Sequence, residues 1–276
     1  MKKLLSFVLS AGLSLSLFAA EIFTYAPLTG NIKNYTETEF SIASKFGNYF
    51  RTPSVKYSHL FDENGKEIEQ NELTPRDAVI SKLLSVYNED GTLAEQSYTN
   101  SDGDMVWKTK ISYKDGLKVD LSEYDAKDNL KDRTIYTYVN NLLEDETSYD
   151  GEGALVWKTI YKYNSNGKLE TVSEYKADGN LSEEKIYTYN ETGAIDTITY
   201  FDSFQGTQTQ DIFRYGTNNV LNEITGYDST KKVVKRVLLK YDTTGNVNKV
   251  SVYNVAEKFG TTVNELVEMS EFVYEY

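Results

Sequence analysis

Few side chains in this sequence are suited to chemistry. It contains a single histidine, His59, and no cysteine. A two-histidine metal site, a thiolate nucleophile and a zinc–thiolate site are therefore excluded within one chain. His59 lies in the alternating segment 57–60, and an isolated strand histidine is far more often packed than catalytic. No serine stands in a Gly-x-Ser-x-Gly context, the usual mark of an activated serine nucleophile.

Neighbouring carboxylates are the remaining candidates for acid–base catalysis. The pair Glu183-Glu184 and the run Glu144-Asp145-Glu146 offer the two carboxyl groups that glycoside hydrolysis needs. Acidic residues recur along the whole chain, however, and nothing in the sequence distinguishes one pair from the others. We therefore expect no enzyme activity, no catalytic residues and no cofactor, and keep a hydrolase on a β scaffold as the last alternative.

The acidic turns are also candidate calcium ligands. Asn100, Asp102 and Asp104 place side-chain oxygens at alternate positions around Gly103. The segment lacks the acidic first ligand and the distant glutamate of an EF-hand. Because turn geometry alone accounts for asparagine and aspartate here, we expect no metal site.

Aromatic side chains are the abundant functional groups, with 23 tyrosines, 12 phenylalanines and 2 tryptophans in 276 residues. Exposed rows of such rings could stack on sugars. Alternatively, the rings form the core of a sheet that curls or is covered, which we favour because a long uncovered aromatic face would aggregate. If the row is a binding surface, its candidate residues are Trp107, Trp157, Tyr136, Tyr161 and Tyr187.

The elements that position these rings repeat along the chain. Two interleaved series of tyrosines recur with gaps of 25 to 27 residues and together use 14 of the 23 tyrosines. The first series is Tyr87, Tyr113, Tyr138, Tyr163, Tyr189, Tyr215 and Tyr241, and the second is Tyr98, Tyr124, Tyr149, Tyr175, Tyr200, Tyr227 and Tyr253.

Each repeat predicts a β-hairpin. Turn signals such as Asn164-Ser165-Asn166-Gly167 follow the first tyrosine, because asparagine bonds its own backbone and glycine accepts positive φ. Between turns, apolar and polar residues alternate with the period of a strand, as in 106–113.

The repeat motif Tyr-x-x-x-Gly-x-Leu…Tyr-x-x-x-Gly, clearest over 163–189, resembles the tyrosine–aspartate (YD) or Rhs repeats of secreted bacterial proteins. It is distantly similar to MORN-like aromatic–glycine repeats. The resemblance covers residues 28–276 and implies a fold of β-hairpins, without catalytic residues.

The sequence therefore predicts an all-β protein, an antiparallel β-hairpin repeat array that forms an extended curved sheet or a β-solenoid, with repeats of about 26 residues and two strands each. We expect a signal peptide at 1–20, a degenerate N-terminal capping repeat at 21–60, hairpin repeats at 61–253 and C-terminal capping strands at 254–276.

Two segments depart from the repeat. Residues 74–84 could open a helix, with Thr74 as cap and Pro75 first inside, but they are in phase with a strand ending at Tyr87, which we favour. Tyr253 and Tyr274 are separated by 21 residues, which predicts an extra loop around 257–264.

The N-terminus has the pattern of a secretory signal peptide. Lys2 and Lys3 precede an apolar stretch that ends at small residues, and the stretch is too short to span a membrane comfortably. Cleavage near Glu21 changes the formal net charge from −13 to −15, which makes nucleic acid an improbable partner. We expect an exported protein that is periplasmic, on the cell surface or extracellular, with no membrane span in the mature chain.

The functional expectation is a non-catalytic repeat protein that serves as a binding or scaffold surface in the cell envelope. Its partners would be a protein or a cell-surface glycan. The alternative is an outer-membrane β-barrel, since the antiparallel strands and the aromatic end, 272–276, suit one. Charges on both faces of strands such as 181–189 argue against that alternative.

Overall fold

A computed structural model describes residues 22–45, 48–258 and 260–276. These described residues form 18 antiparallel strands, one helical turn at 22–25 and a short 3-10 turn. In chain order the elements are β1 (Asn34–Lys45), β2 (Asn48–Phe61), β3 (Glu67–Leu73), β4 (Val79–Tyr87), β5 (Leu93–Asn100), β6 (Met105–Lys114), β7 (Leu117–Asp125), β8 (Leu130–Val139), β9 (Leu142–Asp150), β10 (Leu155–Tyr163), β11 (Leu169–Lys176), β12 (Leu181–Tyr189), β13 (Ile195–Asp202), β14 (Thr207–Tyr215), η1 (Thr217–Asn219), β15 (Leu221–Tyr227), β16 (Val233–Tyr241), β17 (Val247–Lys258) and β18 (Thr261–Glu275).

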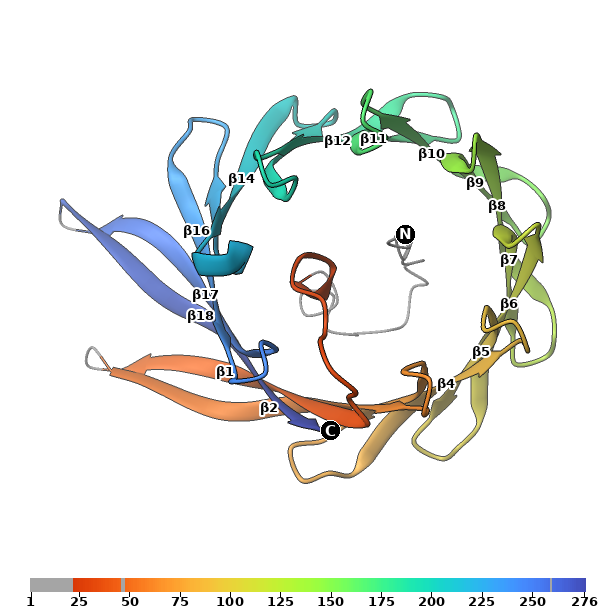
Figure 1. Cartoon of the computed structure of the whole chain (residues 1–276), viewed down its shortest axis with the longest axis horizontal. Helices are drawn as coiled ribbons and strands as arrows, with labels where there is room; N and C mark the ends of the chain where they lie inside the picture. Colours follow the sequence, from red (N-terminus) through yellow and green to blue (C-terminus); the bar gives the residue numbers. More distant parts are fainter. Residues whose placement is uncertain (1–21, 46–47, 259) are drawn as a thin grey trace.

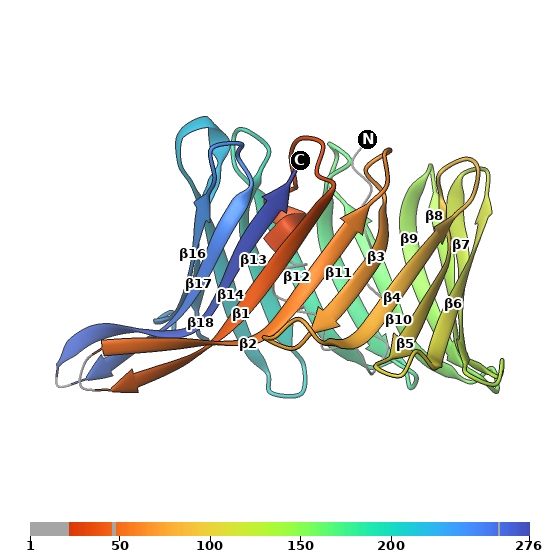
Figure 2. The same ribbon diagram turned by 90° about the horizontal axis from the view of Figure 1, so that it is seen from below.

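The sheet closes on itself into a barrel (Figures 1 and 2). Every strand pairs with the next one in the chain, and β1 pairs with both β2 and β18. The seam runs in antiparallel register from Asn34 opposite Glu275 to Ser41 opposite Glu268. The predicted antiparallel hairpins are confirmed, whereas the extended sheet or solenoid is wrong: pairing the first strand with the last satisfies both edges, which an open array leaves exposed.

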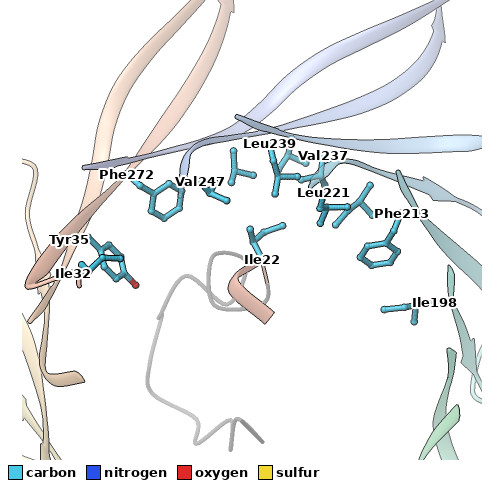
Figure 3. Packing of buried hydrophobic residues seen from close by; sticks show 13 residues of the cluster. Ile22, Ile32, Tyr35, Ile198, Phe213, Leu221, Val237, Leu239, Val247 and Phe272 are labelled. Atoms are coloured by element: carbon cyan, nitrogen blue, oxygen red, sulfur yellow. The ribbon is translucent and has the colours of Figure 1, made fainter. Parts of the chain in front are cut away.

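Alternate residues of each strand face the inside and the outside of the barrel. Figure 3 identifies the inner side, because Phe213, Val237 and Tyr35 point toward Ile22, which lies within the ring of strands. The remaining inward positions follow from the strand register. An 18-stranded barrel encloses more space than its inward side chains fill, so its inner wall is a second surface of the molecule.

The first tyrosine series lies on this inner wall, at the last or next-to-last residue of the even-numbered strands from β4 to β16. Several of these hydroxyls donate a hydrogen bond to the backbone carbonyl 20 residues earlier, on the neighbouring hairpin. The bonds are Tyr87 to Glu67 (2.8 Å), Tyr113 to Leu93 (3.0 Å), Tyr189 to Leu169 (2.6 Å), Tyr215 to Ile195 (2.8 Å) and Tyr241 to Leu221 (2.5 Å). The repeat of about 26 residues therefore ties each hairpin to the one before it.

The turns have the predicted chemistry. The side-chain oxygen of Asn164 accepts hydrogen bonds from the backbone N–H groups of Asn166 (3.0 Å) and Lys168 (3.1 Å). Gly167 adopts a φ of 71°, which an L side chain rarely tolerates. A register shift lies between Lys162 and Tyr163, just before this turn, as expected for a hairpin with a bulge.

Both irregular segments continue the strand pattern, the first after a turn at 74–78. The segment that follows Pro75 forms β4, so the strand interpretation is confirmed over the helix. The predicted extra loop at 257–264 is wrong, because the inserted residues lengthen β17 and β18 and pair across them, with Ala256 opposite Val263. Backbone pairing satisfies more hydrogen bonds than a loop would. Figure 2 shows the resulting hairpin and the β1–β2 hairpin extending beyond one rim.

The segment that precedes β1 lies inside the barrel. Ile22 is 1% exposed and belongs to a buried cluster from β1 and β13–β18. Phe23 contacts Tyr35 and Phe272 edge-on, at centroid distances of 5.8 and 5.4 Å. The segment thus provides the apolar core that a barrel wall of one sheet does not provide alone. The predicted signal peptide, 1–20, lies outside the described residues.

Candidate binding surface on the inner wall

The inner wall has two chemically different sectors. One sector, formed by β1 and β13–β18, is apolar and is covered by the segment from Ile22 to Leu28 (Figure 3). The other sector, from β5 to β12, carries tyrosine, tryptophan, threonine and carboxylate side chains together with three lysines, Lys118, Lys176 and Lys185. Glu174 and Glu183 on this sector are exposed although they face inward, so the wall at β11 and β12 is accessible.

All five candidate binding residues face this interior. Trp107 lies on β6, Tyr136 on β8, Trp157 and Tyr161 on β10, and Tyr187 on β12, each at an inward position of its strand. Tyr136 is buried, with 4% of its surface exposed, and Tyr187 packs against the edge of the apolar cluster. The rings are thus neither an exposed outer face nor a solid core, and their role in binding stays a prediction.

A buried carboxylate organises the middle of the polar sector. Glu146 lies opposite Tyr136 on β8 and Thr159 on β10 and is 5% exposed. Tyr161 forms a side-chain hydrogen bond with Glu146. The ammonium of Lys118 lies 4.1 Å from the centroid of the Tyr136 ring, a cation–π contact. Two rings and one cation thus surround a single carboxylate.

The cluster changes the acidity of its members. Burial lowers the pKa of Lys118 to about 8, although the Glu146 carboxylate opposes the shift. Burial raises the pKa of Tyr161, and the charge of Glu146 adds to that effect. Both shifts have the same physical cause, since removal from water disfavours the charged form of each group.

Carboxylates also face one another across strands on this wall. Glu123 on β7 lies opposite Asp132 on β8, and Glu174 on β11 lies opposite Glu183 on β12. Like charges in direct cross-strand register are destabilising. Among the described residues, no salt bridge involves Asp132, Glu174 or Glu183. Sequence reasoning missed these pairs, because their partners are nine residues apart and become neighbours only through the register.

The pairs that the sequence placed side by side are separated by the fold. Glu183 faces inward, whereas Glu184 faces outward and accepts a hydrogen bond from Ser173 (2.9 Å). Glu146 faces inward, whereas Asp145 forms an outer ion pair with Lys158 (3.3 Å). Successive strand residues point to opposite faces, so neither sequence pair shares one site.

The outer wall carries a ring of cross-strand ion pairs at the middle of the strands. They are Lys82–Glu69 (3.0 Å), Arg133–Asp120 (2.5 Å), Lys158–Asp145 (3.3 Å), Arg236–Glu223 (3.7 Å) and Lys249–Glu271 (3.5 Å). Most of the second tyrosine series lies on this outer face, each ring opposite a long polar side chain, as with Tyr149 opposite Arg133. The outer surface therefore combines charged and aromatic side chains with exposed apolar ones such as Leu84, Ile186 and Leu238.

His59 faces inward beside the seam. Its ring stacks on Tyr35 at a centroid distance of 4.1 Å, and its Nδ1 lies 2.5 Å from a carboxylate oxygen of Glu67. Within the described ranges, no group of three or more histidine, aspartate or glutamate side chains is arranged to hold a metal ion. Nor does that part of the chain contain a helix long and apolar enough to cross a membrane.

Comparisons with known proteins identify the fold alone. No protein-family model matches the chain, and no curated protein matches it. Its structure is similar to the crystal structure of a porin-like protein from Bacteroides uniformis, with a TM-score of 0.51 and 14% sequence identity. That match covers 90% of this chain and 99% of that chain. A porin-like protein from Bacteroides vulgatus matches more distantly, with a TM-score of 0.38 and 10% identity over 88% of this chain and 98% of that one. The chain thus shares a closed antiparallel β-barrel fold with a porin-like protein.

Proposed function

We propose that the protein is a non-catalytic, porin-like barrel of the cell envelope that binds a ligand on its inner wall. The observation that carries this proposal is the division of the inner wall. An apolar sector is covered by the chain's own segment, Ile22 to Leu28, while the sector from β5 to β12 carries half-buried aromatic rings and, on β11 and β12, exposed carboxylates. Accessible polar and aromatic groups on a concave wall are the usual composition of a binding site.

The outer wall favours a barrel that stands in water. Each ion pair of the outer ring puts a lysine or arginine near the middle of its strand, where a membrane barrel needs an apolar band. A lysine or arginine at the bilayer midplane costs about 2–4 kcal/mol.

An outer-membrane β-barrel, the alternative expected from the sequence, is the other candidate. Closure of the described strands without a free edge and similarity to a porin-like structure support it better than they support an open binding or scaffold array. Outward aromatic rings also lie at one level toward the rim opposite the chain ends, Tyr124, Tyr149 and Tyr175 among them, and aromatic girdles mark the interfaces of membrane barrels. In both candidates the inner wall is the working surface.

The repeat architecture belongs to the same proposal. The hairpin that each 26-residue unit forms is the element that a YD or Rhs repeat supplies, and we propose that this chain is a small relative of such proteins. The signal-peptide pattern at 1–20 supports export, and the acidic composition suits a soluble envelope protein.

Because the chain has no cysteine, engineered thiols test both the closure and the surroundings of the barrel. Thr36 on β1 lies opposite Val273 on β18, so Cα atoms at this pair fall within disulfide range. The double variant Thr36→Cys/Val273→Cys should form an intramolecular disulfide on mild oxidation. The mismatched pair Thr36→Cys/Val139→Cys should not, and its cross-linking at the same rate would contradict the closed barrel.

The reactivity of a single engineered thiol distinguishes a barrel in water from a barrel in the outer membrane. Thr137 is exposed at an outward position of β8, whereas Thr134 is fully buried at an inward one. In purified protein without detergent, Thr137→Cys should react rapidly with a polyethylene-glycol maleimide, and Thr134→Cys slowly. Protein that needs detergent, and that protects Thr137→Cys in liposomes, would establish the outer-membrane candidate instead.

A further inference from the structure

The polar sector of the inner wall contains the same four-residue arrangement twice. In the first module Trp107 precedes Thr109 on β6, Thr109 lies opposite Glu123, and Glu123 lies opposite Asp132. The second module repeats each relationship two hairpins later, with Trp157, Thr159, Glu174 and Glu183. The intervening hairpin carries Thr134 opposite Ser148 instead. The chain thus places one ring, one hydroxyl and two facing carboxylates at two equivalent positions.

Two donors of the first module lack a protein partner. The hydroxyl of Thr109, a residue that is 6% exposed, has no hydrogen-bond partner among the described residues, and the indole N–H of Trp107 has none either. Leaving such buried groups unpaired costs free energy. A ligand of this wall would therefore supply hydrogen-bond acceptors as well as donors.

We propose that the inner wall from β6 to β12 binds an oligosaccharide that carries free amino groups. This proposal rests on the proposed function and names its ligand. The non-polar face of a sugar ring packs on Trp157 and on the face of Trp107 that Tyr98 leaves free, since Tyr98 stacks on the other face with ring centroids 5.4 Å apart. The sugar oxygens accept hydrogen bonds from the Thr109 hydroxyl and the Trp107 indole N–H once the side chains that cover these buried donors move aside. An ammonium group neutralises each pair of facing carboxylates, which otherwise repel each other.

The spacing of the modules selects an oligomer over a single sugar. Trp107 on β6 and Trp157 on β10 are separated by four strand spacings, which is about 19 Å along the wall. A monosaccharide fits one module at a time, whereas a chain of several sugars reaches both. Occupying two linked sites strengthens binding beyond either site alone. Lys176 lies opposite Trp157. Because its positive charge repels the ammonium group of the ligand, that group is directed toward Glu174 and Glu183 in the second module.

The two tryptophans are the only ones in the chain, so fluorescence reports directly on the two modules. Titration of residues 21–276 with the β-1,4-linked tetramer of glucosamine should change the emission of both tryptophans. We expect binding at least tenfold tighter than for the N-acetylated tetramer, cellotetraose or monomeric glucosamine. The variants Trp107→Phe and Trp157→Phe show which module causes a change in fluorescence, since each variant keeps only one tryptophan.

Charge variants test the role of the carboxylates. Glu174→Gln/Glu183→Gln should weaken binding of the glucosamine tetramer at least tenfold and leave any binding of cellotetraose unchanged. The matched control, Glu184→Gln/Glu223→Gln, removes two carboxylates from the outer wall and should bind as the unmodified chain does. Each variant is first shown to be folded by its urea-unfolding curve.

The outcomes separate this inference from the proposed function. Equal affinity for cellotetraose and the glucosamine tetramer would overturn the requirement for amino groups. If no tetramer changes the fluorescence while the Thr36–Val273 disulfide forms, the oligosaccharide inference fails and the barrel stands. If the disulfide does not form either, the closed barrel fails together with the inference.

Discussion

The hydroxyl of Tyr189 donates a hydrogen bond of 2.6 Å to the backbone carbonyl of Leu169, at the start of the preceding odd-numbered strand. The same bond, with the same separation of 20 residues, recurs at Tyr215 and Tyr241. The repeat length therefore has a structural role. It places each tyrosine, just before the turn of its own hairpin, beside a backbone carbonyl just after the turn of the previous hairpin. Removal of one hydroxyl should weaken one link in this chain of hairpins.

We predict that Tyr189→Phe lowers the free energy of unfolding by about 0.5–1.5 kcal/mol, the usual net value of one hydrogen bond. Urea denaturation followed by circular dichroism measures the change. Tyr175→Phe is the control, since that ring faces outward on β11 and its loss of a hydroxyl should change the free energy by less than about 0.5 kcal/mol. Equal effects of the two substitutions would contradict the role of the inner bond.

The segment inside the barrel should stabilise the apolar sector strongly. Ile22 is 1% exposed and contacts a cluster from several strands, so Ile22→Ala should cost about 2–5 kcal/mol. The control is Phe204→Ala, because Phe204 is 90% exposed in the turn after β13 and should lie within about 0.5 kcal/mol of the unmodified protein. A small effect at Ile22 would mean that the segment leaves the barrel in solution.

Stability should rise with pH above neutrality because of Lys118. Its pKa in the folded protein is about 8, below the ordinary value of 10.5. Above pH 8 the unfolded chain still binds this proton while the folded chain releases it, so folding is favoured as pH increases toward 10. We expect a gain of about 1–2 kcal/mol between pH 8 and pH 9.5.

Urea denaturation at several pH values, with Lys118→Met beside the unmodified chain, measures this slope. Lys118→Met should lose the rise, and Lys110→Met should keep it, because Lys110 faces outward on β6 opposite Glu95. A rise that survives in Lys118→Met would assign the pH dependence to another group.

Ion pairs of the outer ring should contribute little. Lys158 and Asp145 are 3.3 Å apart and the lysine is 40% exposed, so Asp145→Asn should lower stability by about 0.2–1 kcal/mol at low salt. The difference should shrink in concentrated sodium chloride, because salt screens exposed pairs. Asp102→Asn, in an exposed turn, is the control and should show no salt-dependent loss. A loss above about 3 kcal/mol would indicate a buried pair instead.

Much of the local structure could be predicted from the sequence, because hairpin signals are local. The period of the first tyrosine series, its turns and the strand alternation around Trp107 all depend on neighbours within a few residues. Closure entered only with the alternative, an outer-membrane β-barrel. It requires the first and last strands to pair, Asn34 opposite Glu275, and no local signal marks a pair so far apart in the chain.

The faces of the second tyrosine series show a further limit. Tyr98 and Tyr124 each follow a first-series tyrosine by 11 residues, yet Tyr98 faces inward opposite Trp107 and Tyr124 faces outward opposite Lys108. The two-residue turn at Asp115-Gly116, with positive φ at both positions, replaces the longer turn found after Tyr87. A change of one residue in register moves a side chain to the other face, so spacing alone does not decide which rings line the interior.

For the same reason, the sequence indicated the tryptophans and tyrosines of the candidate surface but missed how its carboxylates pair across strands. Trp107 and Trp157 are conspicuous by type. Glu174 and Glu183 resemble ordinary solvent-facing charges until the register places them opposite each other on the inner wall.

The seam also determines how the chain can fold. Every other strand pair is a hairpin between neighbours, which needs little loop closure and forms quickly. The β1–β18 pair joins residues 241 positions apart, and an unstructured chain of that length seldom brings its ends together. Once neighbouring hairpins have paired into a curved sheet, the curvature of the sheet brings the first and last strands close to each other. Folding should therefore proceed along the chain and finish at the seam, with a slow last step whose rate depends on the curvature that the preceding hairpins have built.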